Sequence, residues 1–260
     1  MRRIPIHLNL EEIPAAFHPF LRGATLYDSS CSPAARVVYL EREGGFYLKS
    51  SAKGSLAKEA AMTRFFHEKG LGPEVLRYES GEKDWLLTAR VAGEDCTHRD
   101  YLADPKRLCD TLAERLRALH ELDGRGCPVP DHTASYLALA QENYRAGMFD
   151  PSYFESEQGI TAEEAWRTVQ AGRHLLVSDT LLHGDYCLPN VVLDQWSFSG
   201  FIDLGNGGLG DRHVDLFWGV WSLRYNLKTD QYRQRFFEVY GKDRVDEERL
   251  RIIAAIETFG

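Results

Sequence analysis

The sequence has few of the features that mark secreted, membrane-bound or nucleic-acid-binding proteins. Its five cysteines form an odd, scattered set without a C-x-x-C pair, which argues against a disulfide framework or a zinc site and favours a reducing, cytoplasmic location. No apolar run reaches membrane-spanning length, and the region after Arg2 and Arg3 lacks the apolar core of a secretory signal. Acidic residues outnumber basic ones, 39 to 31, which excludes a general nucleic-acid binder.

The chain is nevertheless rich enough in apolar residues to form a globular protein. Its 260 residues are 43% hydrophobic and 12% aromatic, and they suit one large domain or two lobes. The net charge of −8 is uneven, because residues 1–93 sum to about +2 and residues 94–260 to about −10. This difference fits an anionic ligand in the first part and a cationic one in the second, although a solvated acidic surface would also explain it.

Local patterns change at Gly93, which we take as the boundary between two parts. Residues 1–93 read as a small, strand-rich lobe, and residues 94–260 as a larger, mainly helical lobe, which together predict an α+β fold. In the first part we expect strands over Arg36–Arg42, Phe46–Ser50, Glu74–Glu79 and Asp84–Val91, and a helix over Leu56–Lys69. In the second we expect helices over Pro105–Leu122, Ala134–Ala146, Thr161–Ala171 and from His213 onward, with strands over Val191–Leu193 and Phe198–Ile202.

The most informative stretch reads H-G-D-Y-C-L-P-N from His183 to Asn190, and it is followed by F-I-D-L-G from Phe201 to Gly205. Phosphoryl transfer from a nucleotide needs these residue types. One carboxylate orients or deprotonates the attacking hydroxyl, while a second carboxylate and an amide oxygen hold Mg²⁺ against the phosphates.

This arrangement resembles the kinase-like aminoglycoside phosphotransferases, above all the 3′-phosphotransferase (kanamycin kinase) group, over nearly the whole chain. The resemblance implies a protein-kinase-like two-lobe fold, with residues 1–93 binding the nucleotide and residues 94–260 carrying the catalytic loop and the aminoglycoside site. By position it makes Asp185 the catalytic base and Asn190 and Asp203 the ligands of Mg²⁺, of which two ions are expected. His183 is expected to support the loop.

The resemblance also assigns nucleotide-binding residues in the first part. Lys49 would hold the phosphates of ATP or GTP, and Glu59 in the following helix would pair with it. Ser32 would contact phosphate oxygens, although an ordinary Ser/Pro turn would explain its loop equally well. Ala89 and Val91 correspond to the hinge, where the family's main chain meets adenine.

Acceptor residues are less clearly marked. Glu155, Glu157 and Glu257 fall where the family places acids that face the cationic antibiotic, but each could equally be a solvated surface acid. At Asn206, Trp221, Tyr225 and Thr258 the sequence departs from its relatives, and these changes concern the choice of antibiotic more than the reaction. We expect Phe17, Phe20, Trp218 and Trp221 to be packing residues.

The sequence therefore predicts a transferase that moves the γ-phosphate of ATP or GTP to the 3′-hydroxyl of an aminoglycoside and so gives antibiotic resistance. It would act on small molecules, as a monomer or homodimer, without nucleic acid or membrane. A kinase of the same fold acting on an amino alcohol, a sugar or another antibiotic remains an alternative. A catalytically dead nucleotide-binding module is a weaker one, because Lys49, Asp185, Asn190 and Asp203 are all present.

Overall fold

The computed structural model describes residues 4–154 and 159–260, which form two compact units. The first unit is the described part of Met1–Gly93 together with Ser199–Gly205, and the second is Glu94–Phe198 with Asn206–Gly260. The short segment that carries Asp203 thus belongs to the first unit, although it is distant in sequence. Among the described residues, no helix is both long and apolar enough to cross a membrane.

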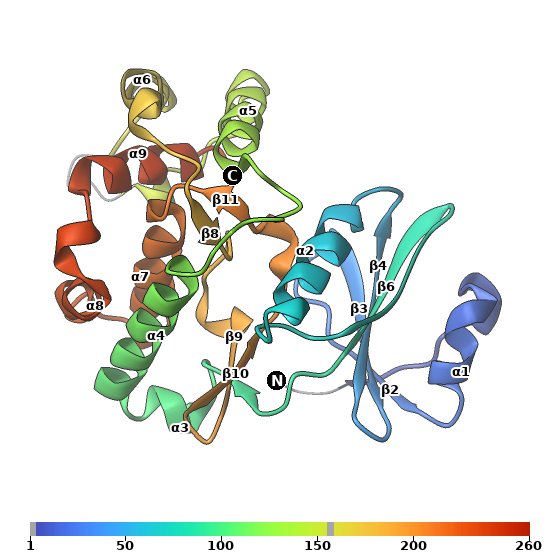
Figure 1. Cartoon of the computed structure of the whole chain (residues 1–260). Helices are drawn as coiled ribbons and strands as arrows, with labels where there is room; N and C mark the ends of the chain where they lie inside the picture. The colour runs from blue at the N-terminus through green and yellow to red at the C-terminus, as the bar shows by residue number, and fades with distance from the viewer. Residues whose placement is uncertain (1–3, 155–158) are drawn as a thin grey trace. The chain divides into compact units, whose positions relative to one another are not determined.

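The first unit is built on an antiparallel sheet of six strands in the order β1-β2-β3-β4-β6-β5 (Figure 1). Its strands are β1 (Ile4–Pro5), β2 (Thr25–Asp28), β3 (Ala35–Glu41), β4 (Phe46–Ala52), β5 (Val75–Ser80) and β6 (Lys83–Ala89). Its helical segments are η1 (Leu10–Glu12), η2 (Ala15–Phe17), α1 (His18–Leu21) and α2 (Ala57–Glu68).

The two faces of this sheet are covered by different segments. Leu48 of β4 and Leu87 of β6 pack with Phe17 and its neighbours from the N-terminal helical turns. Leu86 packs instead with Leu56 and Ala60, at the start of α2. Successive side chains of a strand point to opposite faces, and Lys49 is the register partner of Leu86. Lys49 therefore lies on the face that α2 covers.

The second unit is mainly helical, with short strands between its helices (Figure 1). Its α-helices are α3 (Arg99–Leu102), α4 (Pro105–His120), α5 (His132–Arg145), α6 (Ala162–Gly172), α7 (His213–Leu227), α8 (Arg233–Tyr240) and α9 (Glu247–Glu257). Its 3-10 turns are η3 (Pro151–Tyr153), η4 (Arg173–Leu175), η5 (Leu188–Asn190) and η7 (Lys242–Arg244). The short strands are β7 (Glu94–Asp95), β8 (Thr180–Leu182), β9 (Val191–Asp194) and β11 (Gly208–Gly210); β10 (Ser197–Phe201) and η6 (Leu204–Asn206) lie where the chain enters and leaves the first unit.

Helix α4 is central to the packing of the second unit. Its apolar side chains at Leu108, Leu112, Leu116 and Leu119 are buried, as their spacing predicts. The helix packs against α7 and α8. The observed α+β class confirms the prediction, and most element bounds differ from those predicted by one or two residues.

A buried carboxylate fixes the start of α2 and yields a stability prediction. Asp84 of β6 is fully buried and accepts hydrogen bonds from the backbone N–H of Leu56 (2.9 Å), the Tyr78 hydroxyl (3.0 Å) and the Ser80 hydroxyl (2.6 Å). Replacing Asp84 with Ala leaves buried donors unpaired and should lower the free energy of unfolding by about 3 kcal/mol in urea titrations. Ser80→Ala, which removes one bond, should cost about 1 kcal/mol. Equal midpoints for Asp84→Ala and the wild type would contradict this role.

Candidate active site

In the first unit, one ammonium group is held between two carboxylates. The Nζ atom of Lys49 lies 2.8 Å from Oε2 of Glu59 on α2 and 2.9 Å from Oδ1 of Asp203. The Lys49 and Glu59 side chains are largely buried, at 20% and 12% exposed, whereas Asp203 is 54% exposed. The structure thus brings together three residues that the sequence spreads over more than 150 positions.

Charge and burial compete in this group. Burial by itself would lower the pKa of Lys49, but the attraction of Glu59 and Asp203 outweighs it and the pKa is raised. Burial raises the pKa of Glu59, and Lys49 opposes that rise. Lys49 is therefore charged at neutral pH, and its ammonium group lies next to the exposed carboxylate of Asp203.

The backbone at Asp203 is in the left-handed region, with φ of 57°. Aspartate tolerates this conformation better than most residues, although it costs free energy relative to ordinary backbone. Gly205, two residues later, lies close against Glu59, where an added Cβ would meet the Glu59 side chain at 3.5 Å. The turn over Asp203–Gly205 thus fits around the pair that holds the lysine.

In the second unit, the loop between β8 and β9 carries the H-G-D-Y-C-L-P-N stretch. The side-chain Nδ2 of Asn190 donates to Oδ2 of Asp185 (2.9 Å) and to the Asp185 carbonyl (3.0 Å). With its amino group committed to Asp185, Asn190 presents its carbonyl oxygen elsewhere, as a ligand for a hard cation requires. The buried hydroxyl of Tyr186 donates to the Leu112 carbonyl on α4 (2.8 Å) and anchors the loop.

The buried carboxylate of Asp215, on α7, braces this loop. Its Oδ2 accepts from the backbone N–H of His183 (2.8 Å), and its Oδ1 accepts from that of Gly184 (2.7 Å). Burial opposes ionisation, but the hydrogen bonds from the His120 ring and the His183 backbone outweigh it, so the pKa of Asp215 is lowered. Gly184 has φ of 84°, and a Cβ there would overlap the Asn206 carbonyl oxygen, so glycine is required.

His120 continues the brace into the core. Its Nε2 lies 3.1 Å from Oδ2 of Asp215, and its Nδ1 lies 2.8 Å from the Tyr240 hydroxyl. Burial lowers the pKa of His120, which favours the neutral ring. A neutral ring donates from Nε2 to Asp215 and accepts at Nδ1 from Tyr240.

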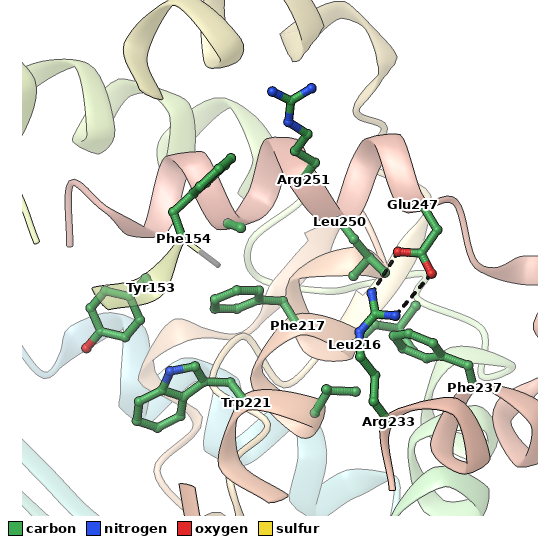
Figure 2. Close-up of a pocket in the computed structure, with 12 residues that line it drawn as sticks. Tyr153, Phe154, Leu216, Phe217, Trp221, Arg233, Phe237, Glu247, Leu250 and Arg251 are labelled. Atoms are coloured by element: carbon green, nitrogen blue, oxygen red, sulfur yellow. Dashed lines mark hydrogen bonds and ion pairs between the residues drawn. The ribbon is translucent and has the colours of Figure 1, made fainter. Parts of the chain in front are cut away.

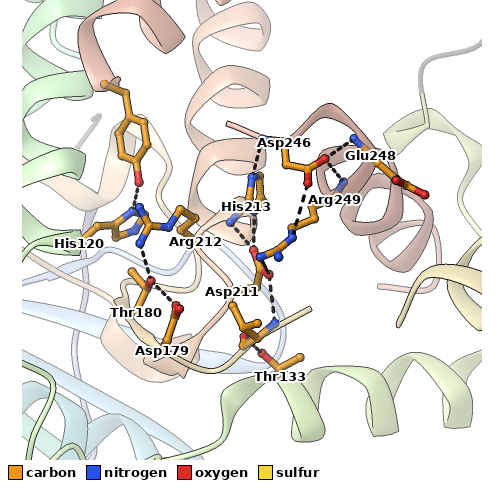
Figure 3. Close-up of polar contacts among 12 residues, drawn as sticks. His120, Thr133, Asp179, Thr180, Asp211, Arg212, His213, Asp246, Glu248 and Arg249 are labelled. Atoms are coloured by element: carbon orange, nitrogen blue, oxygen red, sulfur yellow. Dashed lines mark hydrogen bonds and ion pairs between the residues drawn. The ribbon is translucent and has the colours of Figure 1, made fainter. Parts of the chain in front are cut away.

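A second polar network joins the starts of α7 and α9 (Figure 3). Asp211 accepts from the His213 ring at Nδ1 (2.5 Å), from the Val177 backbone N–H (3.1 Å) and from the Arg249 guanidinium (3.2 Å). The Nε2 atom of His213 accepts from the backbone N–H of Asp246 (2.9 Å). Burial opposes ionisation of Asp211, but the bonds from His213 prevail and lower its pKa. This network holds α9, which ends at Glu257.

Glu257 is buried rather than a solvated surface acid, with 6% of its area exposed. Its Oε1 accepts from the Tyr136 hydroxyl (2.5 Å) and from the Trp218 indole N–H (2.9 Å). Burial raises the pKa of Glu257 to about 7; the two hydrogen bonds oppose that rise, while the negative charge of Asp185 adds to it. Glu257 and Asp185 of the second unit therefore interact electrostatically.

The remaining predicted residues differ in how well the structure defines them. Ser32 is exposed, and its hydroxyl accepts from the backbone N–H of Ala34 (3.1 Å). The backbone N–H of Ala89 donates to the Glu74 carbonyl (3.0 Å), and Val91 is half-buried. Glu155 and Glu157 lie outside the described residues.

Three residues that support the site were not predicted from the sequence. They are His120, which contacts Asp215, and Tyr136 and Trp218, which both donate to Glu257. His120 carried a usable signal, because it follows Leu116 by four residues and so continues the buried stripe of α4. A polar side chain at such a position needs a buried partner. Tyr136 and Trp218 carried no comparable signal.

The brace by Asp215 yields a prediction about the loop. Asp215→Asn places an amide N–H₂ against one of two backbone donors, so the His183–Asp185 turn should lose its geometry and phosphate transfer should fall at least a hundredfold. The free energy of unfolding should fall by about 3 kcal/mol, since one buried backbone N–H loses its acceptor and the hydrogen bonds to a charged carboxylate are lost. His120→Gln, which can still donate to Asp215, should lose much less activity. Full activity in Asp215→Asn would refute the brace.

The raised pKa of Glu257 yields a pH prediction. The folded protein holds this proton up to about pH 7, whereas the unfolded chain loses it near the ordinary glutamate pKa of 4.5. Folding stability from this group is therefore complete below pH 4.5 and is lost as pH rises through 7, by about 3 kcal/mol in total. Glu257→Gln does not titrate and keeps an acceptor for both donors. Its stability relative to the wild type should rise between pH 5 and pH 8 in thermal unfolding, and a constant difference would contradict the raised pKa.

Known proteins are similar to this chain in both sequence and fold. A family model described as "Phosphotransferase enzyme family" matches residues 34–253. A Lactococcus lactis subsp. lactis (strain IL1403) protein named "Probable aminoglycoside 3'-phosphotransferase" is 45% identical over 256 residues, 98% of each chain. The aminoglycoside 3′-phosphotransferase of Niallia circulans is 34% identical over 181 residues, 70% of this chain and 69% of that one.

Solved structures of aminoglycoside phosphotransferases have the same fold as this chain. The crystal structure of an aminoglycoside-3′-phosphotransferase of type VIII matches with a TM-score of 0.79 and 26% identity, over 98% of this chain and all of that chain. A Streptomyces rimosus ATCC10970 aminoglycoside phosphotransferase in complex with ADP and streptomycin shares the fold, with a TM-score of 0.73 and 23% identity over 97% of this chain and 99% of that one. These matches confirm the predicted kinase-like α+β fold and the predicted family resemblance. The chain belongs to the phosphotransferase enzyme family, which includes the aminoglycoside phosphotransferases.

Proposed function

We propose that this protein transfers the γ-phosphoryl group of ATP or GTP to the 3′-hydroxyl of an aminoglycoside antibiotic and so gives resistance to it. The observation that carries the proposal is the position of Lys49 between Glu59 and Asp203. The two carboxylates fix the position of the ammonium group and keep it charged although it is largely buried. A charged ammonium group in a fixed position can bind phosphate oxygens. The names of the relatives supply the acceptor class, and the acidic composition of residues 94–260 suits a polycation.

Residues 1–93 would form the nucleotide-binding part. Lys49 contacts the α- and β-phosphates, Glu59 fixes its position, and Ser32 adds a polar contact to the phosphates. The main chain at Ala89 and Val91 meets the adenine or guanine ring. Both ATP and GTP are proposed as donors.

Residues 94–260 would supply the catalytic loop and the acceptor site. Asp185 accepts the proton of the acceptor hydroxyl and orients it for in-line attack on the γ-phosphorus, while the bond to the β-phosphate oxygen breaks. Its hydrogen bond from Asn190 fixes the carboxylate, and the brace from Asp215 fixes the turn. Glu257, with Glu155 and Glu157, would attract the ammonium groups of the antibiotic.

The donor atoms fit magnesium. Asp203 offers an exposed carboxylate and Asn190 an amide oxygen, and both are hard oxygen ligands. No cluster of three or more His, Cys, Asp or Glu able to hold a metal occurs in the described part of the chain. Mg²⁺ needs none, because it takes one or two protein ligands and completes its shell with phosphates and water. When bound, Mg²⁺ would neutralise charge on the phosphates.

A cellular location and an alternative acceptor class accompany this proposal. The five free cysteines fit a reducing compartment, so we place the protein in the cytoplasm, where ATP is abundant. A second acceptor class, another small hydroxyl compound, is kept as the alternative because residues 206, 221, 225 and 258 depart from the family's usual acceptor-facing residues. Resistance of a bacterial host to kanamycin and neomycin, with and without the gene, separates the two.

Removal of the proposed base tests the reaction. Asp185→Asn keeps the size of the side chain and removes its negative charge, so kcat for kanamycin or neomycin phosphorylation should fall about a thousandfold with little change in the KM for ATP. ADP release coupled to product detection by mass spectrometry measures this. Asp194→Asn, an exposed acid at the end of β9, is the matched control and should behave as wild type. Near-normal turnover in Asp185→Asn would overturn the assignment.

A further inference from the structure

Three aromatic side chains on α7 form a continuous row that starts at Glu257. Trp218 donates to Glu257 and contacts Trp221 edge-on, with ring centroids 5.4 Å apart. Trp221 stacks on Tyr225, with centroids 5.1 Å apart and an interplanar angle of 9°. Residues spaced by three and four lie on one side of a helix, so Trp218, Trp221 and Tyr225 share a face. We call these three side chains the aromatic row.

The outer part of this row is only partly covered. The sequence predicts a packing role for Trp221, and its ring does contact Trp218 and Tyr153, but neither Trp221 nor Tyr225 is fully buried. Tyr225 is 57% exposed, and Trp221 is half-buried. Trp221 also lines a pocket of about 200 Å³, together with Tyr153, whose ring centroid lies 5.7 Å away (Figure 2). Large exposed aromatic groups beside a cavity are typical of binding surfaces.

The row lies within the electrostatic reach of the proposed acceptor residues. Burial raises the pKa of Tyr153, and the negative charges of Asp150, Glu257 and Asp185 add to that rise. Tyr153 contacts both Trp218 and Trp221. The aromatic row therefore begins at one proposed acceptor residue, and Tyr153, which contacts two of its rings, is influenced by the charge of the proposed base.

The row already binds an ammonium group of the chain itself. The Nζ atom of Lys228 lies 4.1 Å from the centroid of the Tyr225 ring, on an exposed lysine just beyond the end of α7. This distance is that of a cation–π contact. An ammonium group of a ligand could take the same position if Lys228 moved into solvent, which its exposed place and flexible stem allow.

We propose that the aromatic row is a specificity-determining face, on which one amino-sugar ring of the acceptor stacks and places an ammonium group over Tyr225 in exchange for Lys228. The inference rests on the proposed aminoglycoside acceptor. It assigns to Trp221 and Tyr225 a role that carboxylates cannot fill. A stacked ring is bound through its C–H face as well as its charge, so part of the affinity does not depend on ion pairs.

Calorimetric titration of the full chain with kanamycin or neomycin, without nucleotide, tests the proposal independently of turnover. Trp221→Leu should raise the acceptor Kd about tenfold and Tyr225→Leu about fivefold, because both lose a ring but stay apolar. Tyr225→Phe keeps the ring and should bind as wild type. Leu139→Ala, at a 49% exposed apolar position on α5, is the surface control and should also bind normally.

The exchange with Lys228 gives a prediction of opposite sign. Lys228→Ala should lower the acceptor Kd more than Lys242→Ala, which removes one exposed positive charge elsewhere in the same unit. In the Tyr225→Leu background the two lysine variants should have equal effects, because the ring is absent.

The outcomes distinguish this proposal from the proposed function. Unchanged Kd in folded Trp221→Leu and Tyr225→Leu, judged by their thermal midpoints, overturns stacking even if phosphate is transferred. Loss of binding in the Leu variants but not in Tyr225→Phe supports stacking, and a wild type that binds without transferring phosphate overturns only the proposed reaction. If no aminoglycoside binds to the wild type, both are overturned.

Discussion

The hydrogen bonds from two consecutive backbone N–H groups to the Asp215 carboxylate are the constraint on which the second unit depends. A fully buried carboxylate is tolerated only when its oxygens are satisfied, and here His120 completes the set. The same bonds fix the turn from which Asp185 and Asn190 project. Burial and hydrogen bonding thus convert a stability requirement of the core into the geometry of the proposed catalytic loop.

The first unit also contains a largely buried charged group, the ammonium group of Lys49, whose charge is stabilised by its neighbours. Lys49 lies on the sheet face that α2 covers, and burial would favour its neutral form. Two carboxylates keep it charged, one fixed on the helix and one on the returning segment at Asp203. Because Asp203 is more than half exposed, its carboxylate can serve a metal ion while the buried Glu59 continues to hold the lysine.

The sequence predicted what depends on local pattern and on motif order. The strands over Arg36–Arg42 and Phe46–Ser50, the apolar stripe of α4 and the order of Lys49, Glu59, Asp185 and Asp203 along the chain all carry such signals. The burial of Glu257 and its contact with Tyr136, 121 residues away, depend on tertiary packing that no local pattern encodes. The sequence predicts packing for Trp218 and Trp221, and Trp218 does pack against the core of the second unit, whereas Trp221 is only half-buried. Spacing reveals which residues share a face but not whether another element covers it.

The proposed function requires the chain to move a phosphoryl group from a nucleotide to one particular hydroxyl. The most direct measurement is ³¹P and ¹H NMR of the product formed from kanamycin and ATP, with the 3′-deoxy analogue as a matched acceptor. The product should be a monophosphate ester at the 3′-oxygen, and no ATP should be consumed with the analogue. Recovery of unmodified kanamycin, or equal phosphorylation of the 3′-deoxy compound, would contradict it.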